Sequence, residues 1–385
     1  MAILRFADRF YFTDGNWDED LSSGREPILI DPKWKDTSLM NLLYQAADFI
    51  GTKQTDQFWM ATSGSSGYPK LVKKTKVQVT NEALFWKNNL ETILGWSIST
   101  VDRFQVSVPL CHLYGLIWGY LLPNILGADI KFLSSSSDLS DCKESDLLIS
   151  IPYLLKKWKE KGYLLPGRIL SSGSKFPVPL AQSFRSEGKV DIREIYGSTE
   201  TGAMGSRNPM WKARYKLLPN LTPGFILEQD KKILKVKSEF VSETGLEVKE
   251  MTGQKISWIV TNLTDAEGFF VTNDCGDLSE IGWNYLGRID RIAKVKGKRI
   301  SLDTIESLIG AIREVSDVAV VSYEKEDQFE IVCFIHILGS KEEFENSLKL
   351  EVPSSHIPTK IFYVDRITKL PNGKTDYQSL IRQSR

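Results

Sequence analysis

Hydrophobic positions in this chain form short apolar runs that alternate with longer amphipathic stretches. The short runs predict strands at residues 57–61, 103–108, 128–133, 147–151, 168–171 and 191–195. Helical spacing of apolar residues predicts helices at 38–50, 80–95, 115–126, 153–161 and 179–188. Short strands that alternate with helices are typical of an α/β fold with mostly parallel sheets.

The pattern changes twice further along the chain. From Leu217 to Thr261, short strands alternate with charged turns, which predicts a small antiparallel β subdomain. The last part predicts, in order, helix 302–314, strands 318–323 and 330–337, helix 341–350, strand 360–364 and a helix from Asp376. We therefore expect a large N-terminal domain, 1–289, and a small α+β C-terminal domain, 290–385.

Composition narrows the class of protein. Hydrophobic residues make up 42% and charged residues 25%, as in ordinary globular proteins. Lys+Arg and Asp+Glu balance at 49 each, which argues against nucleic acid or an anionic membrane as the main partner. The sequence has neither a signal-like start nor an apolar run long enough to span a bilayer. Its four scattered cysteines suit a reducing compartment and argue against a disulfide framework or structural zinc site, so we expect a soluble cytoplasmic protein.

A loop rich in glycine and hydroxyl residues follows the predicted strand 57–61. It reads Thr62, Ser63, Gly64, Ser65, Ser66, Gly67, Tyr68, Pro69 and Lys70. Backbone N–H groups and hydroxyls in such a loop can cradle phosphates, and Lys70 adds a positive charge, although a flexible surface loop has the same composition. The common mononucleotide P-loop is excluded, because the Gly-Lys-Thr at 373–375 lacks its first glycine, where Thr368 stands.

Three more segments carry candidate chemistry. In 196–202, Glu200 follows a predicted strand and could hold Mg²⁺ against a triphosphate, or could lie in a simple solvated turn. In 268–274, Asp274 is a natural partner for ribose hydroxyls. The turn at 370–374 presents Lys374, which taken alone reads as a surface lysine.

The four segments, in this order, resemble the adenylate-forming (AMP-binding) superfamily, which includes acyl-CoA synthetases, adenylation domains of nonribosomal peptide synthetases and firefly luciferase. The resemblance runs from about residue 58 to the end of the chain. It implies a phosphate loop at 62–70 and a Tyr-Gly-x-Thr-Glu motif that includes Thr199 and the Mg²⁺ ligand Glu200. The sequence of residues 294–302 most resembles that of ligases that attach acids to carrier proteins.

The resemblance also assigns further residues. The nucleotide-binding set that it implies is Gly173, Ser174, Tyr196, Gly197, Asp274 and Arg288. The remaining set is His112 near the acyl carboxylate, Asp290 at a domain hinge, Gly297 at a pantetheine channel and Lys374 as the catalytic lysine. Asp277 imitates the same Gly-Asp pattern, but Thr272 and the preceding aromatic residues favour Asp274 as the ribose ligand. The chain departs from the family in having little sequence before the phosphate loop, so we expect a shortened N-terminal region.

The implied reaction has two steps. A carboxylic acid reacts with ATP and Mg²⁺ to give an acyl-adenylate and pyrophosphate. The mobile C-terminal domain then turns about Asp290, and a thiol of CoA or of a phosphopantetheine carrier protein takes the acyl group and releases AMP. Two alternatives stay open: an adenylate-forming enzyme with a non-thiol acceptor, and an inactive nucleotide-binding homologue.

Overall fold

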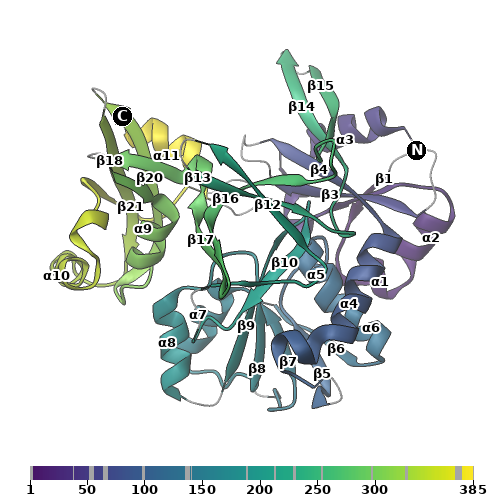
Figure 1. Cartoon of the computed structure of the whole chain (residues 1–385), viewed down its shortest axis with the longest axis horizontal. Coiled ribbons are helices and arrows are strands. Elements are labelled where there is room, and N and C mark those ends of the chain that lie inside the picture. Colours follow the sequence, from purple (N-terminus) through teal and green to yellow (C-terminus); the bar gives the residue numbers. More distant parts are fainter. Residues whose placement is uncertain are drawn as a thin grey trace. The chain divides into compact units, whose positions relative to one another are not determined.

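A computed structural model of the chain describes residues 3–37, 39–51, 56–63, 68–97, 100–134, 139, 141–187, 190–211, 214–228, 231–252, 255–295, 298–325, 328–368 and 375–384 (Figure 1). It divides into two compact units. The first comprises 1–176, 180–224 and 235–271, and the second 177–179, 225–234 and 272–385. The domain boundary expected from the sequence, between residues 289 and 290, stays a prediction.

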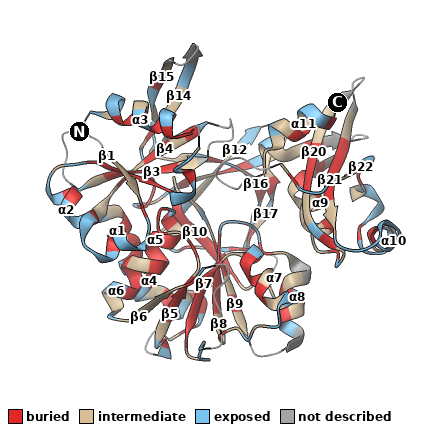
Figure 2. Ribbon diagram, turned by 180° about the vertical axis from the view of Figure 1, so that it is seen from behind, coloured by how far each residue is buried: buried red, intermediate tan, exposed pale blue. Residues whose placement is uncertain are grey.

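The first unit contains a seven-stranded sheet. Its order is β11 (Lys216–Leu217), β10 (Gly202–Arg207), β9 (Asp191–Ser198), β8 (Arg168–Ser171), β7 (Leu147–Ser150), β5 (Arg103–Val106) and β6 (Asp129–Phe132). The run from β9 to β6 is parallel, whereas β10 and β11 pair antiparallel. The accompanying helices are α4 (Lys76–Leu94), α5 (Leu113–Leu116), the π-helix η3 (Ile117–Leu121), α6 (Leu122–Leu126), α7 (Pro152–Glu160) and α8 (Val178–Glu187). Buried residues run along the middle strands, as expected for parallel strands covered on both faces (Figure 2).

A six-stranded sheet completes the first unit. Its order is β1 (Ile3–Phe6), β2 (Pro27–Ile30), β3 (Gln57–Ser63), β4 (Pro69–Thr75), β14 (Thr244–Thr252) and β15 (Lys255–Asn262). Its helices are α1 (Arg9–Thr13), α2 (Asn16–Ser22), the 3₁₀ turn η1 (Pro32–Trp34) and α3 (Leu39–Ile50). Strand β14 belongs to the region predicted as an antiparallel β subdomain, and it pairs with both β15 and β4.

Helix α4 begins earlier than its apolar pattern predicts. Thr75 is its N-cap and forms a reciprocal capping box with Gln78, so the helix starts directly after β4. Gly95 ends it in the left-handed conformation, at φ 74°. The capping residues thus fix the direction in which the chain leaves β4.

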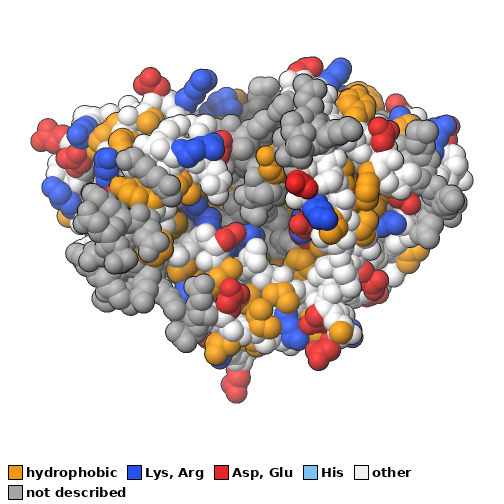
Figure 3. Space-filling model, turned by 90° about the horizontal axis from the view of Figure 1, so that it is seen from above, with side chains coloured by type: hydrophobic (Ala, Val, Ile, Leu, Met, Phe, Trp, Pro, Cys, Tyr) orange, Lys and Arg blue, Asp and Glu red, His pale blue; other side chains and the backbone are white. Residues whose placement is uncertain are grey.

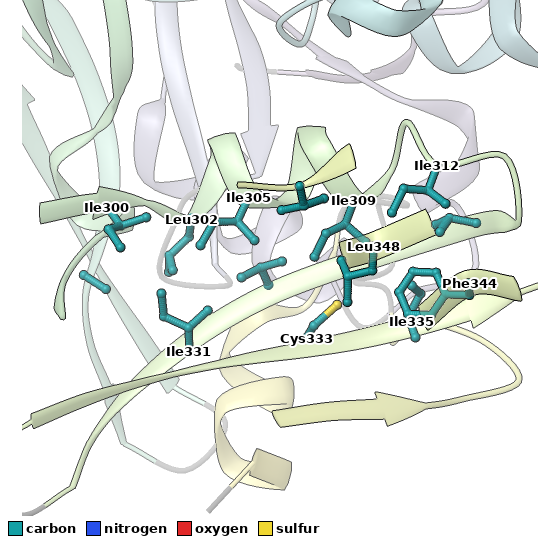
Figure 4. Close-up of a cluster of buried hydrophobic side chains, with 14 residues drawn as sticks. Ile300, Leu302, Ile305, Ile309, Ile312, Ile331, Cys333, Ile335, Phe344 and Leu348 are labelled. Carbon is teal, nitrogen blue, oxygen red and sulfur yellow. The ribbon is translucent and has the colours of Figure 1, made fainter. Parts of the chain in front are cut away.

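The second unit has its own core. Its elements are η4 (Ile289–Arg291), β18 (Ile292–Val295), β19 (Lys298–Ser301), α9 (Leu302–Ile309), β20 (Val315–Lys325), β21 (Gln328–Ile337), α10 (Lys341–Glu351), η5 (Ser354–His356), β22 (Lys360–Tyr363) and α11 (Tyr377–Ser384). Strand β21 lies between β20 and β22, and α9 packs its apolar face on this sheet around Ile305, Ile309, Cys333 and Phe344 (Figure 4). The second unit also includes most of a sheet with the order β12 (Thr222–Glu228), β13 (Lys231–Lys237), β16 (Phe270–Ser279) and β17 (Gly282–Arg288).

The observed elements confirm the predicted fold class, with helices alternating with parallel strands and a later α+β segment. Positive and negative side chains are interspersed on the face drawn in Figure 3, in keeping with the balanced charge. Among the described helices, none is both long and apolar enough to cross a membrane.

Candidate active site

The predicted phosphate loop connects two paired strands. Thr62 lies opposite Lys70 in the β3–β4 pair, and its hydroxyl donates a hydrogen bond to the carbonyl oxygen of Lys70 at 3.1 Å. The predicted loop residues Gly64, Ser65, Ser66 and Gly67 lie outside the described residues, as does the side chain of Ser63. The two ends of the loop are therefore fixed by the ladder of a β-hairpin.

Lys70 lies beside two carboxylates. Its ammonium nitrogen is 2.9 Å from Oε1 of Glu247 and 3.7 Å from Oε1 of Glu200. The three side chains are 22%, 43% and 18% exposed, respectively, so solvent reaches the group. The structure thus brings together Lys70 and Glu200, which the sequence proposed separately for phosphate and for Mg²⁺.

Glu200 lies in a tight turn between β9 and β10. The backbone N–H of Ser198 donates to the hydroxyl of Thr201 at 3.1 Å, and Gly202 leaves the turn at φ +70°. A Cβ on Gly197 would lie 2.3 Å from the carbonyl oxygen of Gly202, so the close approach of the two strands requires glycine. Packing of this hairpin explains the glycines on both sides of the Thr-Glu pair.

The segment predicted to lie along adenine follows β8. Gly173 and Ser174 are exposed there, and the hydroxyl of the preceding Ser172 donates to the carbonyl oxygen of Ile195 at 2.9 Å. Because β8 and β9 are parallel neighbours, their carboxyl ends reach the same edge of the sheet. The predicted adenine segment therefore lies next to the start of the Tyr196 motif.

His112 contacts a residue that the sequence did not single out. Its Nε2 is 3.6 Å from Oδ2 of Asp31, and its side chain is about half exposed. Desolvation by neighbouring protein atoms would lower the pKa of His112, but the Cys111 sulfur and the Asp31 carboxylate raise it above its usual value. A cleft of about 240 Å³ opens beside Asp31 and is also lined by Pro109, Leu110 and other residues.

The same three side chains could hold a metal ion. One ligand atom each from Asp31, Cys111 and His112 lie within 4.8 Å of one another. Sulfur, imidazole nitrogen and carboxylate oxygen are all donors that Zn²⁺ accepts. Spacing alone misses such a group, because Asp31 is far from Cys111 along the chain.

The predicted ribose ligand and hinge lie in the second unit. Asp274 is half-buried and pairs with Arg288 across β16 and β17, whereas Asp277 on the same strand is exposed. The guanidinium of Arg288 makes two bonds to Asp290, at 3.0 and 2.9 Å, and this carboxylate raises the pKa of Arg288. Asp274, Arg288 and Asp290 thus form a local group, whereas Gly297 and Lys374 lie outside the described residues.

Three charged residues near Glu200 were missed by sequence reasoning. Glu247 reaches Lys70 from β14, and the buried Lys74 and Glu82 lie on β4 and α4. The alternation of β4, which puts Lys70 and Lys74 on one face, could have indicated Lys74. Nothing in the sequence near Glu247 or Glu82 identifies either of them.

The described group suits a magnesium-bound polyphosphate. Mg²⁺ prefers carboxylate together with phosphate oxygens, and Glu200 supplies a partly exposed carboxylate at the turn. Lys70 supplies a point charge for phosphate at the end of the predicted loop. Phosphate binding and metal binding can therefore occur side by side.

Known proteins resemble this chain in sequence. The sequence model described as "AMP-binding enzyme" matches residues 30–236. A 4-coumarate–CoA ligase of Cereibacter sphaeroides is 25% identical over 369 residues, covering 92% of this chain and 75% of the relative. A D-alanine–D-alanyl carrier protein ligase of Lactococcus lactis subsp. lactis is 30% identical over 220 residues, covering 51% of this chain and 42% of the relative.

Solved structures share the fold. The o-succinylbenzoate CoA synthetase of Bacillus subtilis, in complex with an acyl-adenylate intermediate, superposes with a TM-score of 0.78 at 19% identity, covering 98% of this chain and 87% of that one. The same enzyme with ATP and magnesium gives a TM-score of 0.75 at 19% identity, covering 99% and 88%.

Proposed function

The chain belongs to the AMP-binding enzyme family, and on that premise we propose a two-step acid–thiol ligase reaction. In the first step, a carboxylate oxygen of the substrate attacks the α-phosphorus of ATP; a P–O bond forms, pyrophosphate leaves, and an acyl-adenylate results. In the second step, a pantetheine thiol attacks the acyl carbon, loses its proton and displaces AMP. The named relatives that use CoA or a carrier protein support a thiol acceptor.

The first step assigns roles to predicted site residues. Lys70 and the loop before it hold the β- and γ-phosphates, Glu200 holds Mg²⁺, and its neighbour Thr199 takes part in catalysis. Bound Mg²⁺ neutralises charge on the triphosphate. Asp274 binds the ribose hydroxyls, and Lys374 stabilises charge between the carboxylate and the α-phosphate. Gly173 and Ser174 border the adenine, Tyr196 and Gly197 belong to the same nucleotide-binding set, and His112 lies near the acyl carboxylate.

The contact between Lys70 and Glu200 is the main support for this assignment. The ammonium of Lys70 lies 3.7 Å from Glu200, although the two residues belong to separate motifs. A phosphate ligand and a magnesium ligand must lie this close if one triphosphate is to contact both. Because the pair is reached by solvent, Lys70 can exchange carboxylate partners for phosphate oxygens at small cost.

The second step assigns the remaining residues. The segment 290–385 turns about Asp290, which withdraws Lys374 and lets a pantetheine arm enter beside Gly297. The acceptor is CoA or a carrier protein. The location is cytoplasmic, which the four free cysteines support.

Acid-dependent exchange of labelled pyrophosphate into ATP tests the first step. We expect one or more acids in a panel of aliphatic and aromatic acids to support exchange, and Glu200→Gln to raise the Mg²⁺ concentration that exchange requires. Glu91→Gln on the exposed side of α4 is the matched control and should behave as wild type. Lack of exchange with every acid would favour a nucleotide-binding homologue without this activity. Exchange without thioester formation from CoA or a carrier protein would favour a non-thiol acceptor.

A further inference from the structure

One face of β4 points two lysines toward the segment that carries Glu200. Side chains alternate along a strand, so Lys70 and Lys74 share a face, while Lys73 lies on the other. Lys73 is 3.9 Å from Glu26 and lies over the ring of Trp59. Lys70 approaches the carboxylate of Glu200, and Lys74 approaches its backbone.

Lys74 is bound by main-chain oxygens. Its ammonium donates to the carbonyl of Phe240 at 2.6 Å and to the carbonyl of Glu200 at 3.4 Å, and the residue is only 1% exposed. The carbonyl of Glu200 also accepts from the backbone N–H of Ser242 at 2.7 Å. Two donors from different segments thus hold the main chain of Glu200.

Glu82 holds the other side of the same turn. Its Oε1 accepts from the backbone N–H of Ala203 at 3.0 Å, and the residue is 4% exposed. A Cβ on Gly202 would lie 2.7 Å from Oε2 of Glu82 and 2.7 Å from Cβ of Phe240. The turn therefore fits against the Glu82 carboxylate without space for a side chain at position 202.

The charges of Lys74 and Glu82 act on each other inside the core. Burial lowers the pKa of Lys74 to about 8, opposed by the carboxylates of Glu82 and Glu200. Burial also raises the pKa of Glu82, opposed by Lys74. Interacting buried charges can often be replaced by apolar residues without loss of stability, so stability alone gives little reason to keep Lys74 and Glu82. What an apolar pair could not supply is the set of hydrogen bonds to both sides of the Glu200 turn.

We infer that Lys74 and Glu82 are positioning residues that fix the turn from Glu200 to Ala203, so that the Glu200 carboxylate is presented to magnesium-bound ATP. This inference rests on the proposed function, since it takes Glu200 to be the magnesium ligand. Outer partners that orient a metal ligand typically change metal affinity 10–100-fold when they are replaced.

The test measures ATP binding by calorimetry at stepped MgCl₂ concentrations, which needs no knowledge of the acid. The double variant Lys74→Met/Glu82→Gln removes both charges together, and urea unfolding checks that it folds. We expect the Mg²⁺ concentration for half-maximal ATP binding to rise about 10–100-fold. Lys73→Met, the same substitution on the other face of β4, is the matched control and should leave that concentration unchanged.

A second variant guards against misfolding of the first. Glu82→Leu alone removes the oxygen that accepts from the Ala203 N–H, and a raised Mg²⁺ requirement in this variant also supports the inference. An unchanged requirement in every variant that folds overturns it.

Glu200→Gln separates this inference from the proposed function. If Glu200→Gln leaves the Mg²⁺ requirement unchanged, the magnesium role of Glu200 is wrong and Lys74 has no ligand to position. If Glu200→Gln raises the requirement and the Lys74 and Glu82 variants do not, only the positioning role is wrong. Adding Glu200→Gln to the double variant should give less than the product of the separate effects, because all three changes act through one ligand.

Discussion

The two ends of strand β4 carry the same residue type on the same face but in different surroundings. Lys70 is partly exposed and contacts the carboxylates of Glu200 and Glu247. Lys74 is buried and contacts backbone carbonyls. An exposed ion pair contributes little and can be exchanged, whereas a buried charge that loses its partner is strongly destabilising. The difference suits Lys70 to ligand exchange and Lys74 to holding the turn.

Removing the buried charge should have the largest effect. Lys74→Met leaves Glu82 in the core without its cation, so we expect the free energy of unfolding to fall by about 3–5 kcal/mol. Lys70→Met should change it by no more than about 1 kcal/mol, because the contacts of Lys70 reach solvent. Urea unfolding of both variants measures the difference.

The double variant sharpens this comparison. Adding Glu82→Gln to Lys74→Met removes the unpaired carboxylate and should restore most of the lost stability. Equal losses of stability for Lys70→Met and Lys74→Met would show that burial does not distinguish the two ends of the strand.

Replacing a third lysine, Lys374, should change the reaction rate and not the free energy of unfolding. Lys374→Ala removes a donor that we assign to adenylation, so pyrophosphate exchange should slow by about 10²–10³-fold. Conversion of a supplied acyl-adenylate and CoA, or a pantetheinylated carrier, into thioester should continue, since that step follows withdrawal of the lysine. Stopped-flow or quenched assays of each half-reaction measure the two rates.

Two outcomes would change the assignment of Lys374. Equal slowing of both half-reactions would contradict the proposed movement about Asp290. Unchanged rates would make Lys374 a surface lysine. Lys341→Ala, on the exposed start of α10, is the control.

The ribose ligand offers a smaller contrast within one strand. Asp274 is half-buried on β16 and Asp277 is exposed. Losing hydrogen bonds to a bound ribose should cost about 1–3 kcal/mol, so Asp274→Ala should weaken ATP binding about 5–150-fold and Asp277→Ala little. Calorimetry with ATP ranks the two variants, and the reverse order would mean that Asp277 is the ribose ligand.

Sequence patterns predicted most strands of the seven-stranded sheet, because fully buried parallel strands are short apolar runs. Strand β4 was missed, since Pro69 and three lysines read as the end of a polar loop. Its burial depends on β3 and β14 on either side, and β14 is far away in the chain. Local composition cannot show that the Lys74 ammonium donates to a backbone carbonyl in the core.

Residues of the candidate site likewise divide into those that local motifs reveal and those that only tertiary packing reveals. The order of the motifs predicted Lys70, Glu200 and Asp274 as site residues, because each lies in a segment with a distinctive local sequence. Glu247, Glu82 and Asp31 lie in segments without such a pattern. Their contacts depend on tertiary packing, which the chain order of motifs does not encode.

The smallest expected effect concerns the exposed end of β4. Glu247 lies across from Lys70 in the continuation of the β4–β14 pair, and its Oε1 is 2.9 Å from the ammonium. This carboxylate competes with phosphate for Lys70, so Glu247→Gln should strengthen ATP binding. Exposed pairs are worth about 0.2–1 kcal/mol, which limits the gain to about fivefold. The gain should shrink as salt is added, because salt screens the competing pair.

Calorimetry with ATP at two salt concentrations measures this gain in affinity, with Glu250→Gln on the same strand as the control. Weaker ATP binding in Glu247→Gln would mean that Glu247 orients Lys70 toward phosphate, and both ends of β4 would then hold their lysines in place.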